Sequence, residues 1–436
     1  MNGEFTHGFV VNRNEDFQER YFGWPSVVCL ESGRILVGAS GPRKYHADGL
    51  GKTSLFISDD NGAHFSAPMI VNDSPLDDRD VGLVSLGGER VLMSWFTAAT
   101  AYRIDGQIPW MTKEDHEQLV RDSARQTAER IARYQGSWIR VSEDGGMTWG
   151  EAHRAPVSAP HGPIRLRSGR IVYVGAVFGA DGREPRGQIA AASSTDDGKS
   201  WELLGAIPFP KALENCGVCE PHAVERTDGS LLAMIRVEGD GIKGLYRSVS
   251  TDGGATWSQA APTGIEGLPA HLLRCSNGAI VLSYGWRSAP YGERARASYD
   301  DGETWGEEIV LRDDGESWDL GYPSTAECRD GSMLTVYYQE PCAVEESKRF
   351  RNEDIKSIQF TKWRIRNGHI VADFRRGGRA ARNSEGSFLR LKNDEIFFAF
   401  TQFCGGSLDD DAPSGIVAIR SADEGETWSE PEQLIE

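Results

Sequence analysis

The stretch SYDDGETW, residues Ser298 to Trp305, recurs with small changes at five other places in the chain. The shared pattern is S-x-D-x-G-x-[TSH]-[WF], and the other copies are SDDNGAHF (58–65), SEDGGMTW (142–149), STDDGKSW (194–201), STDGGATW (250–257) and SADEGETW (421–428). In such a turn Ser and Asp side chains can accept hydrogen bonds from backbone N–H groups just ahead, while Gly supplies a positive φ. The closing aromatic starts the next strand and buries a large apolar area. The octet therefore predicts a hairpin turn with its own packing anchor.

Seven shorter turns alternate with the octets, and apolar residues flank each of them, as in PSVVCLESGRILVG (25–38). This pattern is typical of strand, turn and strand. The turns are Ser32-Gly33, Gly87-Gly88, Ser168-Gly169, Asp228-Gly229, Asn277-Gly278, Asp330-Gly331 and Asn393-Asp394. Six of these units continue into an octet, whereas the unit that opens at Tyr322 runs into SIQFTKWRI (357–365) without one.

Most units therefore contain two strands, a loop, a third strand, the octet and a fourth strand. The units lie near 22–75, 78–157, 159–210, 218–265, 267–312, 320–376 and 383–436. A four-stranded unit with a period of about 50 residues indicates a β-propeller, because one such sheet cannot bury both of its faces whereas a ring of sheets can. We expect an all-β fold, a single propeller domain over residues 1–436, with seven blades or, as the alternative, a six-bladed closure.

One segment interrupts the β pattern inside the second unit. TKEDHEQLVRDSARQTAERIARYQG, residues 112–136, contains helix formers throughout, a Thr at its start and a Gly at its end. These features predict a helical insertion on a loop. It could serve as a lid, as a packing element or as a dimer contact.

Composition narrows the class of partner and the cellular compartment. The 436 residues carry a net charge of −18, which argues against nucleic acid or an anionic membrane surface as a partner. The first residues, MNGEFTHGFVVNRNEDF, are polar and acidic, so we expect no leader peptide. Seven scattered cysteines favour reduced thiols and a cytoplasmic protein over a disulfide framework. Cys216 and Cys219 form a lone C-x-x-C, and we expect neither a metal nor a cofactor.

Ionisable residues gather where the first strand of each unit begins and in the loops after the second strand. In a propeller the innermost strands face the central channel, and loops at one mouth form a concave pocket, where a ligand is expected to bind. The strand starts carry Asp78, Arg79, Asp80, His161, Glu220, His222, His271 and Tyr322, and the loops carry Arg43, Asp48, Arg236, Arg287 and Arg294. We therefore expect function at this mouth and the octets at the opposite one.

The octet resembles the Asp box of the sialidase (neuraminidase) superfamily, and the chain resembles a member over most of its length. This resemblance implies a retaining glycosidase with a Tyr nucleophile, a Glu that assists it, an Asp acid/base and three Arg that hold the substrate carboxylate. The anomeric carbon of a sialic acid carries a carboxylate, so a neutral phenol approaches it with less repulsion than a second carboxylate would. A nearby Glu draws the phenol proton, as a base does for any weak nucleophile.

The resemblance assigns roles to particular residues. CEPHAVERTDGSLLAMIR (219–236) implies Glu220 as the base and Arg236 as a clamp residue. LGYPSTAECRDGSMLTVYY (320–338) implies Tyr322 as the nucleophile. SYGWRSAPYGERARASYDDGETW (283–305) implies Arg294 as a further clamp residue, with Arg287 close behind. FGWPSVVCLESGRILVGASGPRKYHADG (22–49) implies Arg43 as a clamp residue and Asp48 as the acid/base.

Three departures from the family pattern bear on the substrate. Gly23-Trp24-Pro25 stands where the family has Arg-Ile-Pro, so the first clamp Arg is missing. VYYQ (336–339) lacks the Glu that steadies that Arg. The seventh unit exceeds the usual six and offers Arg382, Glu385 and Asp410 as rivals for clamp and acid/base roles.

Three functions fit these residues, and all of them have a carbohydrate as the partner. The first is a sialidase-like exo-glycoside hydrolase that acts on an acidic sugar. The second is another carbohydrate-active enzyme, a lyase or a uronic-acid or deoxy-sugar glycosidase, in which His161, His222 or His271 would serve with Tyr322 as acid and base. The third is a non-catalytic carbohydrate-binding propeller, because a fold does not by itself imply an activity.

Overall fold

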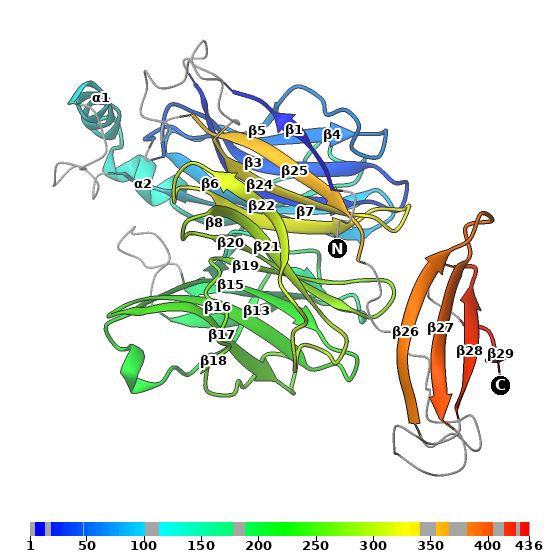
Figure 1. The fold of residues 1–436 in the computed structure, drawn as a ribbon. Helices are drawn as coiled ribbons and strands as arrows, with labels where there is room; N and C mark the ends of the chain where they lie inside the picture. Colours follow the sequence, from blue (N-terminus) through cyan, green and yellow to red (C-terminus); the bar gives the residue numbers. More distant parts are fainter. Residues whose placement is uncertain are drawn as a thin grey trace. The chain divides into compact units, whose positions relative to one another are not determined.

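The computed structural model describes residues 5–13, 19–46, 48–100, 113–177, 188–340, 355–365, 382–403, 414–423 and 428–435. The chain divides into two compact units, Met1–Arg364 and Ile365–Glu436, where the sequence had suggested a single domain over 1–436. In the part that the structure describes, no helix is long and apolar enough to cross a membrane. Figure 1 shows the course of the chain.

Unit 1, Met1–Arg364, contains six antiparallel sheets that follow one another along the chain. The first sheet consists of β2 (Tyr21–Cys29), β3 (Ile35–Arg43), β4 (Thr53–Ser58) and β5 (Met69–Asn72). The second consists of β6 (Asp77–Gly87), β7 (Arg90–Ala98), β8 (Gly136–Ser142) and β9 (His153–Ala155). The third consists of β10 (Val157–Ser158), β11 (Ile164–Arg165), β12 (Ile171–Val177), β13 (Ile189–Ser194) and β14 (Glu202–Ala206). The fourth is β15 (Gly217–Glu225), β16 (Leu231–Gly239), β17 (Ile242–Ser250) and β18 (Ala261–Pro262), preceded by a short 3₁₀ helix, Lys211–Leu213. The fifth is β19 (Ala270–Arg274), β20 (Ile280–Trp286), β21 (Tyr291–Ser298) and β22 (Ile309–Gly315).

The sixth sheet draws its strands from both ends of unit 1. It consists of β23 (Gly321–Glu327), β24 (Met333–Gln339), β25 (Ser357–Trp363) and, as its outer strand, β1 (Thr6–Val11). Thr6 lies opposite Lys362 and His7 opposite Thr361. The unit that opens at Tyr322 needs no octet, because its fourth strand comes from the N-terminus.

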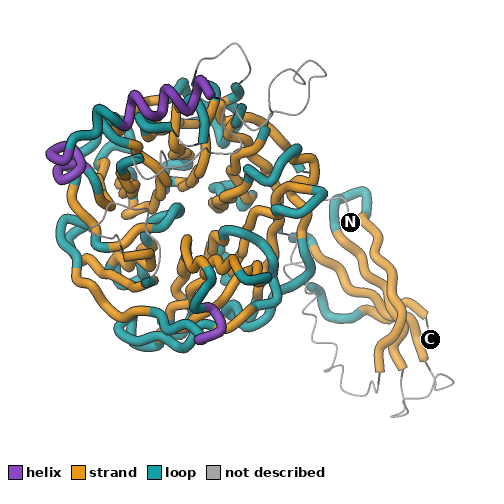
Figure 2. The backbone as a smooth tube through the Cα atoms, turned by 90° about the vertical axis from the view of Figure 1, so that its left-hand side faces the viewer, coloured by secondary structure: helices purple, strands orange, loops and turns teal. Residues whose placement is uncertain are grey.

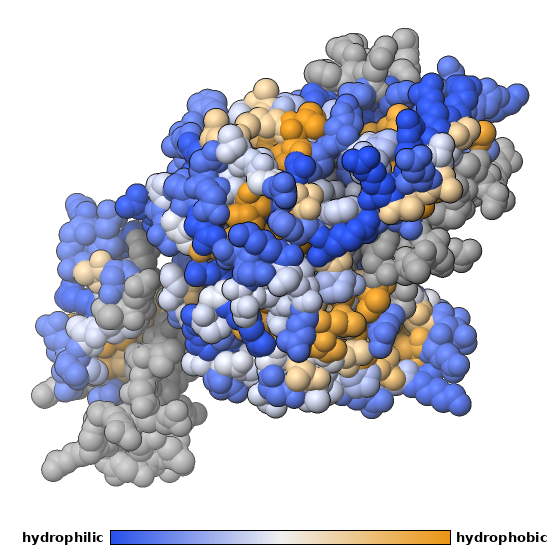
Figure 3. Space-filling model, turned by 180° about the vertical axis from the view of Figure 1, so that it is seen from behind, coloured by the Kyte–Doolittle hydropathy of each residue, from blue (hydrophilic) through white to orange (hydrophobic). Residues whose placement is uncertain are grey.

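The sixth sheet packs against the first, so the sheets of unit 1 follow one another around a common axis (Figure 2). One apolar cluster joins residues of the first sheet, Phe22 and Ile35, to residues of the sixth, Leu334 and Val336, all of them buried. Similar clusters lie between the first and second, second and third, third and fourth, and fourth and fifth sheets. This propeller-like arrangement buries both faces of each sheet, as the repeat had predicted. Hydrophilic side chains predominate on the face of unit 1 turned to the viewer in Figure 3.

The five octets that the structure describes in full form the turns that the sequence predicted. In the copy at Ser298, the Ser hydroxyl donates to Asp300 at 2.7 Å and accepts from the Gly302 N–H at 2.8 Å, and the same Asp accepts from the Thr304 N–H at 2.9 Å. Gly302 has a φ of 82°. The aromatic packs as expected but precedes the fourth strand: β14 begins at Glu202, directly after Trp201, and β9 only at His153, four residues after Trp149.

Strand register separates the octets from the expected functional mouth. Tyr21 at the start of β2 lies opposite Arg43, whereas Cys29 at its end lies opposite Ile35. Ser58, where the first octet begins, also lies opposite Ile35. The octet is therefore at the end of the sheet away from Arg43.

The helical insertion consists of two helices rather than one, α1 (Lys113–Ser123) and α2 (Ala128–Tyr134). The break has a local cause, because the Thr127 side chain accepts from the Arg130 N–H and starts a second helix. It also has a tertiary cause, since Gln126 is buried and donates to the Gly49 carbonyl at 3.0 Å. Gly136 opens β8 instead of capping a helix.

Unit 2, Ile365–Glu436, contains one four-stranded antiparallel sheet. Its strands are β26 (Arg382–Arg390), β27 (Ile396–Phe403), β28 (Ser414–Ser421) and β29 (Glu432–Ile435). Phe400, Val417 and Ile419 form its small core. Asp410 and the side chains of Arg382 and Glu385, the rivals named from the sequence, lie outside the described residues.

Candidate functional site

Four inner strands of unit 1 share one backbone irregularity at the same mouth. Trp24, Asp80, Glu220 and Tyr322 have φ values of 51°, 55°, 52° and 52°, and each lies at a β-bulge where the register to the second strand shifts. Positive φ is uncommon for side chains of this kind, and a bulge turns a side chain toward a new direction. Backbone strain of this sort persists only where the surroundings enforce it, and it concentrates at functional sites.

Two of these four residues share a short hydrogen bond. The Tyr322 hydroxyl donates to Glu220 Oε1 at 2.5 Å. Arg236 Nη1 donates to the other oxygen, Glu220 Oε2, at 2.8 Å, and its Nη2 donates to Glu238 at 2.6 Å. Glu220 thus lies between a phenol and a guanidinium, as the sequence had suggested for these three residues.

The charges around this group favour a neutral phenol beside an ionised carboxylate. Burial opposes ionisation of Glu220, but the Arg236 guanidinium and the Tyr322 hydroxyl outweigh it and lower the pKa of this carboxyl. Burial and the Glu220 charge raise the pKa of Tyr322 well above its usual value. The carboxylate is therefore ready to receive the phenol proton once the phenol oxygen begins to react.

Arg287, rather than Arg294, lies beside the phenol. The Arg287 guanidinium is 5.4 Å from the centre of the Tyr322 ring and donates to the Leu320 carbonyl at 3.0 and 3.2 Å. Arg294 instead contacts Glu308 at 3.4 Å and donates to the carbonyls of Pro290, Glu293 and Arg312. The contacts of Arg294 thus lie within its own sheet, whereas Arg287 lies beside the phenol.

Arg43 is fully buried and already has a carboxylate partner. Its two terminal nitrogens bind Asp77 at 2.6 and 2.9 Å, and Nη2 also donates to the His46 carbonyl at 3.1 Å. A bidentate pair of this kind is strong and costly to separate. Arg43 stabilises the base of the loop after β3, and in this arrangement its guanidinium is not open to a substrate.

Trp24 is buried, and in the sequence it lies next to the position where the family has its first clamp Arg. The Arg79 guanidinium lies 4.1 Å from its ring, which is the distance of a cation–π contact. The indole also meets His46 edge-on at 4.9 Å and Tyr322 edge-on at 6.4 Å. His46 is held in turn by Asp319 at 3.2 Å. An aromatic group beside a cation therefore stands near Tyr322 where the family places a clamp Arg.

Asp80, on β6, was noted in the sequence as a strand start but was given no role. Its side chain is partly buried, and its Oδ1 atom is buried without a hydrogen-bond partner among the described residues. Burial raises the pKa of Asp80 to about 7, Arg79 opposes this rise and Glu220 adds to it. The charge of Asp80 in turn raises the pKa of Tyr322.

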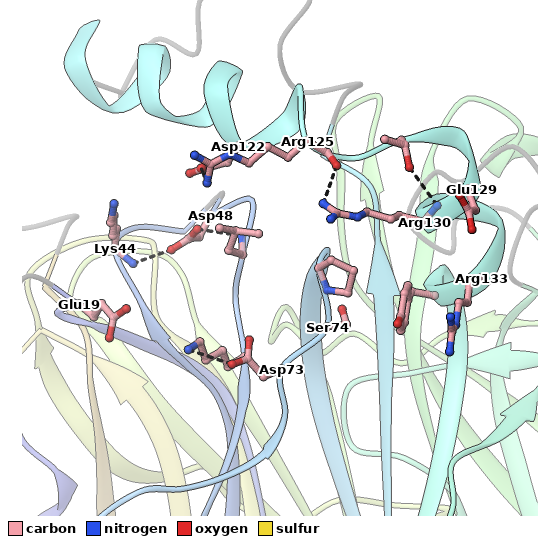
Figure 4. A pocket seen from close by; sticks show the side chains of 15 residues that line it. Glu19, Lys44, Asp48, Asp73, Ser74, Asp122, Arg125, Glu129, Arg130 and Arg133 are labelled. Carbon is pink, nitrogen blue, oxygen red and sulfur yellow. Dashed lines mark hydrogen bonds and ion pairs between the residues drawn. The ribbon is translucent and has the colours of Figure 1, made fainter.

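Asp48 lies on the wall of a pocket of about 1140 Å³ (Figure 4). Its Oδ2 accepts from the Lys44 N–H at 2.8 Å and its Oδ1 from the Leu50 N–H at 3.0 Å, so both oxygens close the loop after β3. The pocket lies between this loop, residues 73–75 and the helical insertion. Both acidic and basic side chains line it: Glu19, Lys44, Asp48, Lys52, Asp73, Asp122, Arg125, Glu129, Arg130 and Arg133. Tyr322, Glu220 and Arg236 are not among the described residues that line it.

The three histidines of the inner strands meet on the axis. His222 and His271 stack at 4.5 Å, and His161 lies 5.1 Å from His271. Nδ1 of His222 accepts from the Leu272 N–H at 3.0 Å. Burial lowers the pKa of His222 to about 3 and those of His161 and His271 well below their usual values. These rings are neutral and buried, and the hydrogen bond to His222 links the fourth sheet to the fifth.

The spacing of the sequence could have identified Trp24. Glu220 and Tyr322 each stand eight residues before the Asp of an Asp-Gly turn, Asp228 and Asp330, and Trp24 stands eight residues before Ser32, which opens its own turn. Asp80 stands seven residues before Gly87, so it shares the backbone conformation of the other three but not their spacing.

No group of His, Cys, Asp and Glu suited to a metal occurs in the part of the chain that the structure describes. The described cysteines, Cys29, Cys216, Cys219, Cys275 and Cys328, are free thiols. Cys216 donates to the Gly239 carbonyl at 3.3 Å.

Comparison with known proteins fits this arrangement. Residues 119–336, half of the chain, match the family model described as a BNR repeat-like domain. The chain therefore belongs to the BNR-repeat superfamily that includes the sialidases, as its octets indicated. No curated protein matches it.

Solved structures share the fold at low sequence identity. A protein of unknown function from Dyadobacter fermentans is 21% identical, covers 83% of this chain and 98% of its own, and gives a TM-score of 0.63. The Hadza microbial sialidase Hz136 is 16% identical over 82% of this chain and 68% of its own, with a TM-score of 0.57. The NanB sialidase of Streptococcus pneumoniae is 14% identical over 82% and 70%, also with a TM-score of 0.57. At these identities the likeness concerns the fold.

Proposed function

We propose that this protein is a retaining exo-glycoside hydrolase that uses Tyr322 as nucleophile and Glu220 as its base, on the six sheets of unit 1 closed by β1. The supporting observation is the 2.5 Å hydrogen bond from the Tyr322 hydroxyl to Glu220, whose second oxygen is held by Arg236. A structural ion pair alone would not require a buried phenol with left-handed backbone on each side of the bond.

The reaction proceeds in two displacements. In the first, Tyr322 Oη bonds to the anomeric carbon, its proton moves to Glu220 Oε1, and the bond to the leaving-group oxygen breaks as an acid protonates that oxygen. In the second, water attacks the same carbon, and Tyr322 leaves and recovers its proton from Glu220. Two inversions retain the anomeric configuration.

The substrate carries a carboxylate, because two cations face the phenol. Arg236 contacts Glu220, the Arg287 guanidinium lies 5.4 Å from the centre of the Tyr322 ring, and both arginines are partly exposed. Charge-assisted hydrogen bonds to a carboxylate contribute about 1.5–3 kcal/mol each. With Arg43 engaged by Asp77, two such residues, rather than three, hold the acidic sugar.

The test is release of the aglycone from a panel of aryl glycosides of sialic and uronic acids, followed by proton NMR of the first product. Release with retained configuration by the wild type, lost in Tyr322→Phe, is the expected result. Inversion, or an unsaturated product that absorbs in the ultraviolet, would contradict the proposal and favour an inverting hydrolase or a lyase. Binding of the sugar without turnover would favour a carbohydrate-binding propeller.

A further inference from the structure

We propose that Asp80 is the acid that protonates the leaving group and the base that later activates water, a role that the sequence had given to Asp48. This inference rests on the proposed glycosidase function and adds the second carboxyl of the reaction. Three observations carry it: the backbone position of Asp80, the unused capacity of its carboxyl group and the different situation of Asp48.

The first observation is the shared bulge. Asp80 occupies on β6 the position that Glu220 occupies on β15 and Tyr322 on β23, with the same left-handed φ. Inner strands of a propeller face a common axis, so equivalent positions point toward one mouth. In keeping with this placement, the Glu220 charge raises the pKa of Asp80, and the charges of Glu220 and Asp80 raise that of Tyr322.

The second observation is the unpartnered oxygen. Asp80 Oδ1 is buried without a hydrogen bond among the described residues, although the backbone N–H of the same residue is bound by Ser40 Oγ at 2.9 Å. A buried polar atom without a partner is costly, and it calls for an explanation. A hydrogen bond to the glycosidic oxygen of a bound substrate would supply the missing partner.

The third observation concerns Asp48. Both of its oxygens accept backbone N–H groups within one loop, so this carboxylate holds the loop together. Asp80 makes no such side-chain bond through its Oδ1 among the described residues, and burial raises its pKa to about 7. Near neutral pH a substantial fraction of Asp80 therefore carries the proton that a general acid must donate.

The proton balance closes with these residues. As the glycosidic bond breaks, the Asp80 proton moves to the departing oxygen, and the aglycone leaves as a neutral alcohol. The Asp80 carboxylate then takes a proton from water, whose oxygen bonds to the anomeric carbon while Tyr322 departs. Asp80 ends the cycle protonated, and Glu220 ends it ionised.

The test compares Asp80→Asn with Asp48→Asn on two aryl glycosides of the same acidic sugar, one with a 4-nitrophenol and one with a 4-methoxyphenol leaving group. A good leaving group needs little protonation, so loss of the acid lowers the rate selectively for the poor one. For Asp80→Asn we expect a loss of about 10²-fold or more in the first displacement with 4-methoxyphenol and a small loss with 4-nitrophenol. Asp80→Glu, which keeps the acid, should recover part of the activity, and Asp48→Asn should treat both substrates alike.

Each result separates the inference from the function on which it rests. Equal losses on both glycosides in Asp80→Asn would mean that Asp80 only contacts the sugar, and would overturn the inference while the Tyr322 mechanism stands. A leaving-group-selective loss in Asp48→Asn instead would return the role to Asp48. If the wild type cleaves neither glycoside nor any other acidic one, the proposed function fails and the inference with it. Thermal unfolding of each variant identifies a loss of rate that comes from misfolding.

Discussion

Tyr322 and Glu220 lie 102 residues apart in the chain, yet their side chains share a 2.5 Å hydrogen bond and their backbones share the same left-handed conformation. The two inner strands that carry them are thus matched in shape as well as in position. If this pair is the nucleophile and its base, Tyr322→Phe removes the reacting oxygen and should lower kcat by about 10³-fold or more.

Tyr337 offers a matched control, because it is a second buried tyrosine of the sixth sheet and its hydroxyl contacts Thr361 and Arg312 instead of Glu220. Tyr337→Phe should keep full activity and lose about 1 kcal/mol of unfolding free energy for its hydrogen bonds. Steady-state kinetics and urea unfolding of both variants test the pair. Equal activity in Tyr322→Phe and Tyr337→Phe would refute the role of Tyr322.

Arg287 and Arg294 give a second comparison, since both are arginines of the fifth sheet region but only Arg287 lies beside the phenol. Arg287→Lys loses the planar fork that binds a carboxylate, so KM for an acidic glycoside should rise about 10-fold to 100-fold. Arg294→Lys should leave KM within about twofold and lower the melting temperature instead. A larger rise in KM for Arg294→Lys would restore the order that the sequence suggested.

The pH dependence of kcat/KM should follow two carboxyl groups in opposite protonation states. Glu220 must be ionised, so activity falls as pH drops through its lowered pKa. Asp80 must be protonated, so activity also falls as pH rises through about 7. The charged groups that set the pKa of Asp80 are Arg79, Glu220, Arg43 and Asp77. A pH profile of the wild type and of Asp80→Asn measures this, and the alkaline limb near 7 should be absent from the variant.

The octets should contribute to stability and not to chemistry. Ser298 is buried, and its hydroxyl both donates to Asp300 and accepts from the Gly302 N–H. Ser298→Ala leaves these groups without a partner and should cost about 1–3 kcal/mol with kcat unchanged. Ser168→Ala, at an exposed hairpin turn, is the control and should cost less than about 0.5 kcal/mol. Equal unfolding midpoints would show that the octet turn is not held by its Ser.

The two ends of the chain should respond differently to truncation. Removal of residues 1–13 takes away β1, exposes the edge of β25 and uncovers the apolar cluster that Val10 and Val11 help to bury. We expect a loss of more than about 3 kcal/mol and a tendency to aggregate. Removal of residues 366–436 leaves every sheet of unit 1 complete, so calorimetry should show its unfolding transition nearly unchanged.

The repeats made most of the fold predictable, because their turns are local. In the five octets that the structure describes in full, the Ser and Asp bind backbone groups within a few residues, so the local sequence alone determines the turn. The partner strand of β1 was not predictable in this way. Thr6 pairs with Lys362, far along the chain, and nothing in the sequence THGFVV (6–11) indicates which strand it will pair with. The insertion was recognised, but its break at Thr127 depends partly on the burial of Gln126 against another loop.

The candidate site was predictable in part. Tyr322, Glu220 and Arg236 come together as the resemblance implied. The order of Arg287 and Arg294 was not readable from the sequence, because the register of β21 shifts between Glu293 and Arg294 and so changes where the Arg294 side chain lies. Asp80 was passed over because its special feature is a backbone conformation and an unpartnered oxygen, which only the three-dimensional structure reveals.

The pairing of β1 with β25 also governs the order in which unit 1 can mature during synthesis. The strand that completes the sixth sheet leaves the ribosome first and must wait until Lys362, its partner in the register, has been made. Pairings of such long range form slowly, and an unpaired strand edge invites contact with other chains in the meantime. β1 is therefore the earliest strand of unit 1 in the chain and one of the last that can reach its final place.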